Sequence, residues 1–146
     1  MEKIDLTFGL RFAEIKLLNY SQFDLEKEFD KDAKALIEFK SNIGFRVLAK
    51  EEQIVCTIDV ILLINETKEE FSKIKVENYF NVTPFKEVIK EKSPNNYDIP
   101  TPLIHNLVSI SVSTVRGIIS EKLKGTIAQK EVYPLINLQD LFKSNK

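Results

Sequence analysis

The segment 103–123 constrains the fold more than any other part of this 146-residue chain. Thr101 and Pro102 precede it, and this pair is typical of a helix start. Thr accepts free amide protons there, and Pro lacks a donor that would go unused. Gly125 follows the segment, where a left-handed residue ends a helix. Apolar side chains form two adjacent helical rows in between: Leu103, Leu107, Ile110 and Thr114, and Ile104, Val108, Val115 and Ile119. So broad an apolar arc predicts a long helix that is buried on more than one side.

The first half of the chain alternates between apolar and polar residues, as β-strands do. Residues 4–17 show this alternation with a change of phase at Ala13, which predicts a bulge. The alternation of residues 33–49 is the longest in the chain, and a helix would scatter its apolar side chains around the circumference. We therefore expect both segments to be strands, with Phe39 and Phe45 in the core.

Two further strands are expected before the helix. Residues 54–64 predict a third strand with part of its length buried on both faces, because apolar residues occupy both alternating positions. Residues 74–82 predict a weaker fourth strand with interleaved charges. The segment 83–102 is expected to be irregular apart from one helical turn near Phe85, which follows Thr83-Pro84.

Strands followed by helices predict an α+β fold in a single domain, residues 1–146. We expect a four-stranded antiparallel sheet, the long helix, and a short C-terminal helix capped by Asn137. A helix on a four-stranded sheet needs only one apolar side. The second apolar side, together with the open sheet edges, predicts a homo-oligomer.

Charge and composition exclude several functional classes. The chain carries 21 basic and 22 acidic residues, whereas a duplex nucleic-acid binder needs a concentrated basic face. Cys56 is the single cysteine, which excludes an internal disulfide and favours a reducing compartment. The first residues do not resemble a signal peptide, and the longest unbroken apolar run, 60–64, is too short to span a bilayer. We expect a cytoplasmic protein without membrane insertion.

The sequence contains no pattern typical of a catalytic or metal site. His105 is the only histidine, no two glycines form a phosphate-binding loop, and the carboxylate pair Glu51-Glu52 falls at a predicted hairpin tip. Cys56 lies in an apolar row and is expected to act as a small hydrophobic residue. We therefore predict neither enzymatic activity nor a cofactor. Arg116 has two open interpretations, a solvent-facing residue or a structural ion pair at a subunit contact.

The last third of the chain resembles the bacterial export chaperone SecB family. Residues 113–119, Ser-Thr-Val-Arg-Gly-Ile-Ile, are similar to the family's Pro-Tyr-Ala-Arg-Glu-Cys-Ile helix segment. Gly125-Thr126 and the segment 134–142 are similar to its Gly-Thr helix exit and its Pro-Val-Asn-Phe-Asp-Ala-Leu-Phe ending. The resemblance implies an ATP-independent holdase whose protomers assemble as a dimer of dimers and need no nucleotide or metal.

The resemblance also implies two sets of binding residues. Unfolded client polypeptides would bind an apolar groove between the sheet, the crossover loop and the helix, formed here by Phe80, Val82, Phe85, Tyr97, Ile99 and Leu103. We expect Phe85 and Tyr97 to face water in the free protein. The family's acidic contacts to the export ATPase SecA are matched by Asp24 and Glu66.

Differences from the family leave the partner open. Residues 129–133 form a charged link where the family has a Pro-rich apolar one, and the chain lacks an acidic tail. A solitary chaperone that protects an antitoxin therefore fits at least as well as an export chaperone. Two other classes remain open: a non-chaperone adaptor that holds one folded partner on the sheet, and a pocketed ligand binder. The latter folds usually place a helix before the sheet, unlike this chain.

Overall fold

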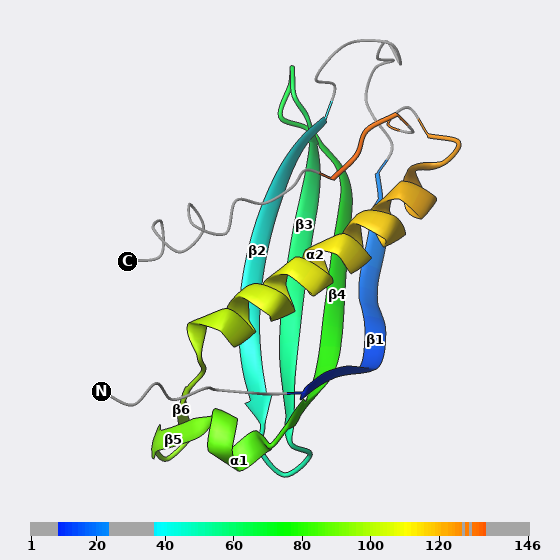
Figure 1. Ribbon diagram of the computed structural model, residues 1–146. Helices are drawn as coiled ribbons and strands as arrows, with labels where there is room; N and C mark the ends of the chain where they lie inside the picture. Colours follow the sequence, from blue (N-terminus) through cyan, green and yellow to red (C-terminus); the bar gives the residue numbers. More distant parts are fainter. Residues whose placement is uncertain (1–8, 24–36, 127, 129, 134–146) are drawn as a thin grey trace.

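The main body of the described chain is a four-stranded antiparallel sheet with a long helix packed on one face (Figure 1). The computed structural model describes residues 9–23, 37–126, 128 and 130–133. Its four long strands are β1 (Gly9–Gln22), β2 (Ile37–Leu48), β3 (Gln53–Ile64) and β4 (Glu70–Thr83), and their order in the sheet is β1-β4-β3-β2. The four-stranded antiparallel sheet and the long helix predicted from the sequence are thus confirmed.

A crossover connects the sheet to the helix. It contains a single helical turn, α1 (Phe85–Val88), and a small hairpin of β5 (Lys90–Ser93) and β6 (Asn96–Asp98). The helix α2 (Thr101–Leu123) follows and runs diagonally across the sheet. The helical turn was predicted, but the hairpin was not. Asn95 adopts a positive φ of 63° at its turn, a conformation that Asn tolerates better than most residues.

The core lies between α2 and the two central strands, β3 and β4. The helix-facing row of β3 is fully buried and is the row predicted from alternation: Ile54, Cys56, Ile58, Val60, Leu62 and Ile64. The buried side of α2 contains Leu103, Leu107, Val108, Val112, Val115, Ile119 and Leu123. Each such aliphatic side chain contributes about 1.5–3 kcal/mol to folding.

The outer side of α2 remains uncovered within the described part of the chain. Ile110 is exposed, and Ile118 is only partly buried. The length of α2 and the mean hydropathy of 1.3 in its most apolar window would also be compatible with a membrane span by composition alone. Its inner row instead belongs to the protein core, which accounts for much of that hydropathy.

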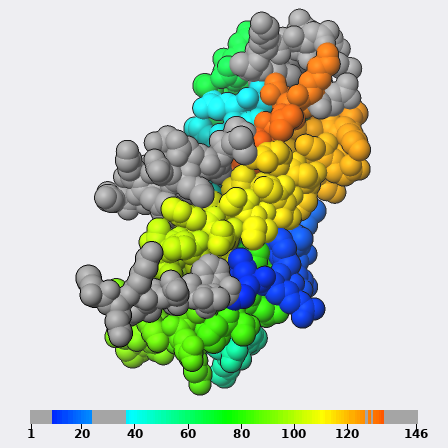
Figure 2. All heavy atoms as spheres, in the orientation of Figure 1, coloured from blue at the N-terminus to red at the C-terminus, as the bar shows by residue number. Residues whose placement is uncertain are grey.

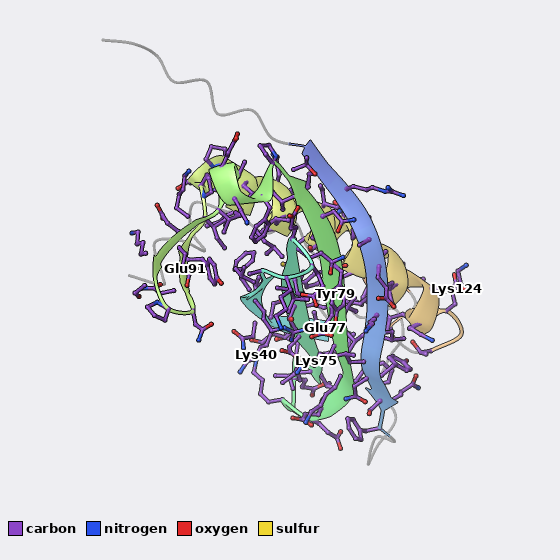
Figure 3. The ribbon with its side chains drawn as sticks, turned by 90° about the horizontal axis from the view of Figure 1, so that it is seen from below. Lys40, Lys75, Glu77, Tyr79, Glu91 and Lys124 are labelled. Carbon is purple, nitrogen blue, oxygen red and sulfur yellow. The ribbon has the colours of Figure 1, made fainter. Side chains whose placement is uncertain are left out.

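The opposite face of the sheet carries a polar network that covers β3. The Tyr79 hydroxyl donates to Glu77 Oε1 at 2.7 Å, and Arg46 Nη1 lies 3.0 Å from Glu77 Oε2. These hydrogen bonds, first from Tyr79 and then from Arg46, lower the pKa of the Glu77 carboxyl. Arg46 pairs with Val55 in the β2–β3 register, and Val55 is fully buried, which confirms that part of β3 is buried on both faces. Figure 3 shows Glu77 and Tyr79 on the side away from α2.

Several local predictions can be compared with the structure. The register of β1 against β4 shifts between Phe12 and Glu14, which confirms the bulge at Ala13, and shifts again between Leu17 and Asn19. Gly125 has a φ of 79°, the left-handed conformation expected after the helix. The predicted Thr101 cap is wrong: Thr101 is the first helical residue and Pro100 holds the cap position, so no side chain caps the helix. The predicted C-terminal helix at Asn137 lies outside the described residues.

Cys56 occupies the centre of the core, as predicted. Its side chain is fully buried, and burial raises the pKa of its thiol to about 11. The thiol therefore stays protonated at neutral pH, and a protonated, buried thiol is a poor nucleophile. Cys56 acts as a small core residue beneath Ser111 of α2.

Candidate functional site

The position of α2 leaves part of an apolar row uncovered on each edge strand. The helix packs mainly on β3 and β4 and crosses the sheet diagonally (Figure 1), so it covers the helix-facing side chains of β1 and β2 only in part, and sections of both strands remain visible beside it in Figure 2. We call the row Leu10, Phe12, Ile15 and Leu17 the β1 flank. We call the row Phe39, Ser41, Ile43, Phe45 and Val47 the β2 flank. The register places both rows on the same face as the core residues of β3 and β4.

The β1 flank is the more exposed of the two. Ile15 is 46% and Leu17 is 42% exposed, although both follow the alternation of core residues. Phe12 is held by a stacked contact with Phe80, at 4.5 Å between ring centroids. Leu18, in the second bulge, adds another exposed apolar side chain to the same edge. β1 is an edge strand, so it also presents a row of backbone groups without strand partners in the described sheet.

The side chains of the β2 flank are covered at one end of the strand and exposed toward the other. At one end Phe39 contacts the ring of Tyr133, with 5.5 Å between ring centroids. Phe45 is 37% exposed toward the other end, where β2 ends near the crossover (Figure 1). The prediction that Phe45 belongs to the core is wrong, because Phe45 lies on an edge strand that the core covers only in part. Phe39, predicted to be core, is partly buried.

The six residues predicted to bind clients converge on the crossover end of the molecule, but most are not at its surface. Phe80, Val82, Phe85 and Leu103 all belong to the buried core cluster. Phe85 is only 5% exposed, so the prediction that it faces water is wrong. The helical turn α1 places this side chain against the sheet rather than into solvent.

Tyr97 and Ile99 are the predicted residues that remain accessible. Both are partly buried and pack on the edge of the core, together with Ile43, Val47 and Ile104. Tyr97 is in β6, which pairs with β5 in the crossover hairpin. We call these side chains, together with Phe45 on the part of β2 that ends near the crossover (Figure 1), the crossover patch. Its role in client binding remains a prediction.

Of the two residues predicted to bind SecA, one lies among the described residues. Glu66 is exposed in the turn between β3 and β4. Asp24 lies outside the described residues. Their role stays a prediction.

Arg116 is partly buried rather than solvent-facing, and the ion pair at a subunit contact stays a prediction. Its Nε donates to the main-chain carbonyl of Tyr133 at 2.9 Å, which ties the segment after α2 back to the helix. Its Nη2 is buried and has no hydrogen-bond acceptor among the described residues. The contact with Tyr133 was missed because it joins two segments whose proximity depends on the path of the chain after Gly125.

Comparison with known proteins identifies the fold. No protein-family description matches the sequence, and no curated protein matches it. Among solved structures, the chain is similar to the SecB-like chaperone Rv1957 of Mycobacterium tuberculosis, solved in complex with a ChAD peptide from the HigA1 antitoxin Rv1956. The TM-score is 0.62 at 9% identity, over 88% of this chain and 90% of that one. A protein of unknown function from Streptococcus agalactiae gives a TM-score of 0.43 at 12% identity, over 90% and 99% of the two chains. The first likeness shows that this chain has the SecB-like fold that the sequence resemblance implied.

Proposed function

We propose that this protein is an ATP-independent chaperone that holds unfolded polypeptide segments on apolar surface beside α2. The observation that carries the proposal is the exposure of Phe45 on β2, together with the partly accessible Tyr97 and Ile99 of the crossover, on a fold shared with a SecB-like chaperone. Apolar contact is non-directional, so such a surface accepts many sequences. No catalytic step is part of the proposed function.

The partner proposed first is an antitoxin or a similarly unstable protein in the cytoplasm. The chaperone Rv1957, which shares the fold, was solved with an antitoxin peptide. A role in protein export through SecA is the other branch of the proposal, and it depends on Asp24 and Glu66. Binding of the protein to purified SecA, and its loss in Glu66→Lys, would select the export branch.

The proposed activity is tested by suppression of aggregation. Several unrelated, chemically denatured proteins are diluted into buffer with and without this protein, in the absence of ATP, and light scattering is followed. We expect suppression for all of them at near-equimolar ratio. If none is protected, the holdase proposal is wrong. If only one is protected, a single-partner adaptor replaces it.

We further propose that the β1 flank and its edge bind a second copy of the chain, as the first step toward a dimer of dimers. β1 offers backbone groups that have no strand partner in the described sheet, along a strand of 14 residues, and Ile15, Leu17 and Leu18 lie exposed beside them. An antiparallel pair of β1 strands about a two-fold axis would satisfy these backbone groups and cover the apolar side chains at once. The uncovered outer side of α2 offers a surface for the second association.

Charge placed on this edge is expected to dissociate the oligomer. Ile15→Glu/Leu18→Glu should turn the wild-type assembly into monomers, because two copies would bury four carboxylates in an apolar contact. Arg11→Glu/Asn19→Glu changes the same strand at positions on the other face of the sheet and is the matched control. Size-exclusion chromatography with light scattering gives the mass. A wild-type protein that is monomeric at micromolar concentration would contradict the proposal.

A further inference from the structure

The segment after α2 places an aromatic side chain on the β2 flank. Tyr133 is only 1% exposed, although it lies outside every helix and strand. Its ring packs at a tilt against Phe39, and its hydroxyl shares a hydrogen bond with the Ser41 hydroxyl. Val132, the preceding residue, is 59% exposed. The segment therefore presents one side chain to the sheet and the previous one to solvent, as an extended peptide on a surface does.

Arg116 of α2 also binds the main chain of this segment. Arg116 Nε donates to the Tyr133 carbonyl at 2.9 Å, a contact that does not depend on which side chain the residue carries. The buried Nη2 of the same guanidinium has no acceptor in the described part of the chain, so it retains the capacity for a second carbonyl. A ring contact from Phe39, a hydroxyl from Ser41 and a guanidinium that binds peptide carbonyls together form a site for one extended aromatic residue.

This site is continuous with the surface proposed to bind clients. Phe39 and Ser41 belong to the same row of β2 side chains as Ile43, Phe45 and Val47. The row leads from Tyr133 at one end to the crossover patch at the other. A client strand that lay along β2 would therefore meet the Tyr133 site.

We infer that the Phe39–Ser41–Arg116 site is an aromatic-binding subsite of the client surface, with a preference for tyrosine, and that Tyr133 is its internal occupant. The inference rests on the proposed chaperone function and names the class of segment that it holds. A client with a suitably placed tyrosine would displace Tyr133, so the chain's own segment competes with clients for the subsite.

The inference is tested by removing the internal occupant and adding it back as a separate peptide. Tyr133→Ala is mixed with a capped peptide of sequence Glu-Val-Tyr-Pro-Leu, which corresponds to residues 131–135. We expect the peptide to raise the melting temperature of the variant but not of the wild type, because a ligand stabilises the protein only where its site is free. The same peptide with Ala in place of Tyr is the control and should have no effect. Tyr133→Leu replaces Tyr133→Ala if the latter does not fold, because Leu keeps part of the apolar contact but makes neither the ring contact with Phe39 nor the hydrogen bond with Ser41, and the tyrosine peptide should displace this weaker occupant.

The tyrosine preference is tested through Ser41. Fluorescence titration should show that the Tyr133→Ala variant binds the tyrosine peptide about twofold to tenfold more tightly than its phenylalanine analogue, the range of one hydrogen bond. Adding Ser41→Ala should remove that preference without abolishing the binding of the phenylalanine peptide. Equal binding of both peptides before the Ser41 change would contradict the assigned role of Ser41.

Competition with a client separates this inference from the chaperone proposal. The tyrosine peptide should displace a fluorescent unfolded client from Tyr133→Ala, and Tyr133→Ala alone should bind that client more tightly than the wild type does. A peptide that binds without displacing the client would overturn the subsite while leaving the holdase activity intact. A wild-type protein that suppresses no aggregation would instead overturn the chaperone proposal, whatever the peptide does. Absence of peptide binding to both Tyr133 variants overturns the inference directly.

Discussion

Replacing Phe80 by Ala is expected to lower the free energy of unfolding by about 3–5 kcal/mol. Phe80 is fully buried in β4, one of the two strands beneath α2, and its ring stacks on Phe12. Truncation removes the ring from the core and leaves a cavity that the central strands cannot close by small movements. For a domain of this size, such a loss lowers the melting temperature by about 10 °C.

The matched control for Phe80 is the same substitution on the edge strand. Phe45→Ala is expected to cost about 1 kcal/mol, because its ring already contacts water in the folded state. Urea denaturation of both variants gives the two free energies on one scale. Similar losses at the two positions would show that the β2 flank is as buried as the core, which would contradict the exposed client surface.

Loss of client binding is the second large effect expected. Phe45→Ser/Tyr97→Ser removes the two aromatic side chains of the crossover patch, and aromatic anchors carry much of the affinity of an apolar interface. We expect the affinity for an unfolded client to fall at least about tenfold, which is equivalent to about 1.4 kcal/mol. Because both side chains are partly accessible, the loss of stability should remain much smaller than that of Phe80→Ala.

Phe23→Ser is the control for a general loss of surface hydrophobicity. Phe23 is 40% exposed just after β1, at the opposite end of the sheet from the crossover, as the β1–β4 register shows. Fluorescence anisotropy with a labelled unfolded client measures all variants. If Phe23→Ser weakens binding as much as the double variant, binding depends on exposed apolar area in general and not on the crossover patch.

The sequence was sufficient to predict the four long strands and α2, but not the β5–β6 hairpin. β3 is recognisable because a central strand needs apolar residues throughout, and Val55 under Arg46 shows why both of its faces are apolar. The limits of α2 follow from Pro102 and Gly125, since each of these residues restricts the backbone by itself. Signals of this kind are local, and so they can be read without knowing the rest of the structure.

The division between core and binding surface was not predictable in the same way. Phe45 and Phe80 both stand in alternating apolar rows, and only the strand order β1-β4-β3-β2 places one at an edge and the other beneath the helix. The alternation of apolar and polar residues indicates which face of the sheet a side chain occupies, but it does not indicate what covers that face. For the same reason, the alternation of residues 4–17 does not indicate that the β1 flank is exposed.

The burial of Tyr133 was also not predictable from the sequence. Its burial depends on the return of the chain after Gly125 and on three partners from two elements, Phe39 and Ser41 of β2 and Arg116 of α2. No periodic pattern surrounds it, because the segment forms neither a helix nor a strand. A single aromatic residue in a charged stretch was the one visible signal, and the sequence alone did not say where its ring would pack.

The strand order also fixes the sequence in which the molecule can form during synthesis. β1 leaves the ribosome first, yet its partner β4 is the last of the four strands to be made: Gly9 pairs with Thr83, and Gln22 with Ser72. The β2–β3 and β3–β4 pairings join neighbours in the chain and close short loops, so they form early. The apolar side chains of β1 therefore remain exposed in the nascent chain until β4 has been synthesised. Even after β4 has been made, one of the two edges of β1 has no partner strand in the described sheet. A protein proposed to protect others from aggregation thus carries, in its own first strand, the kind of segment that chaperones bind.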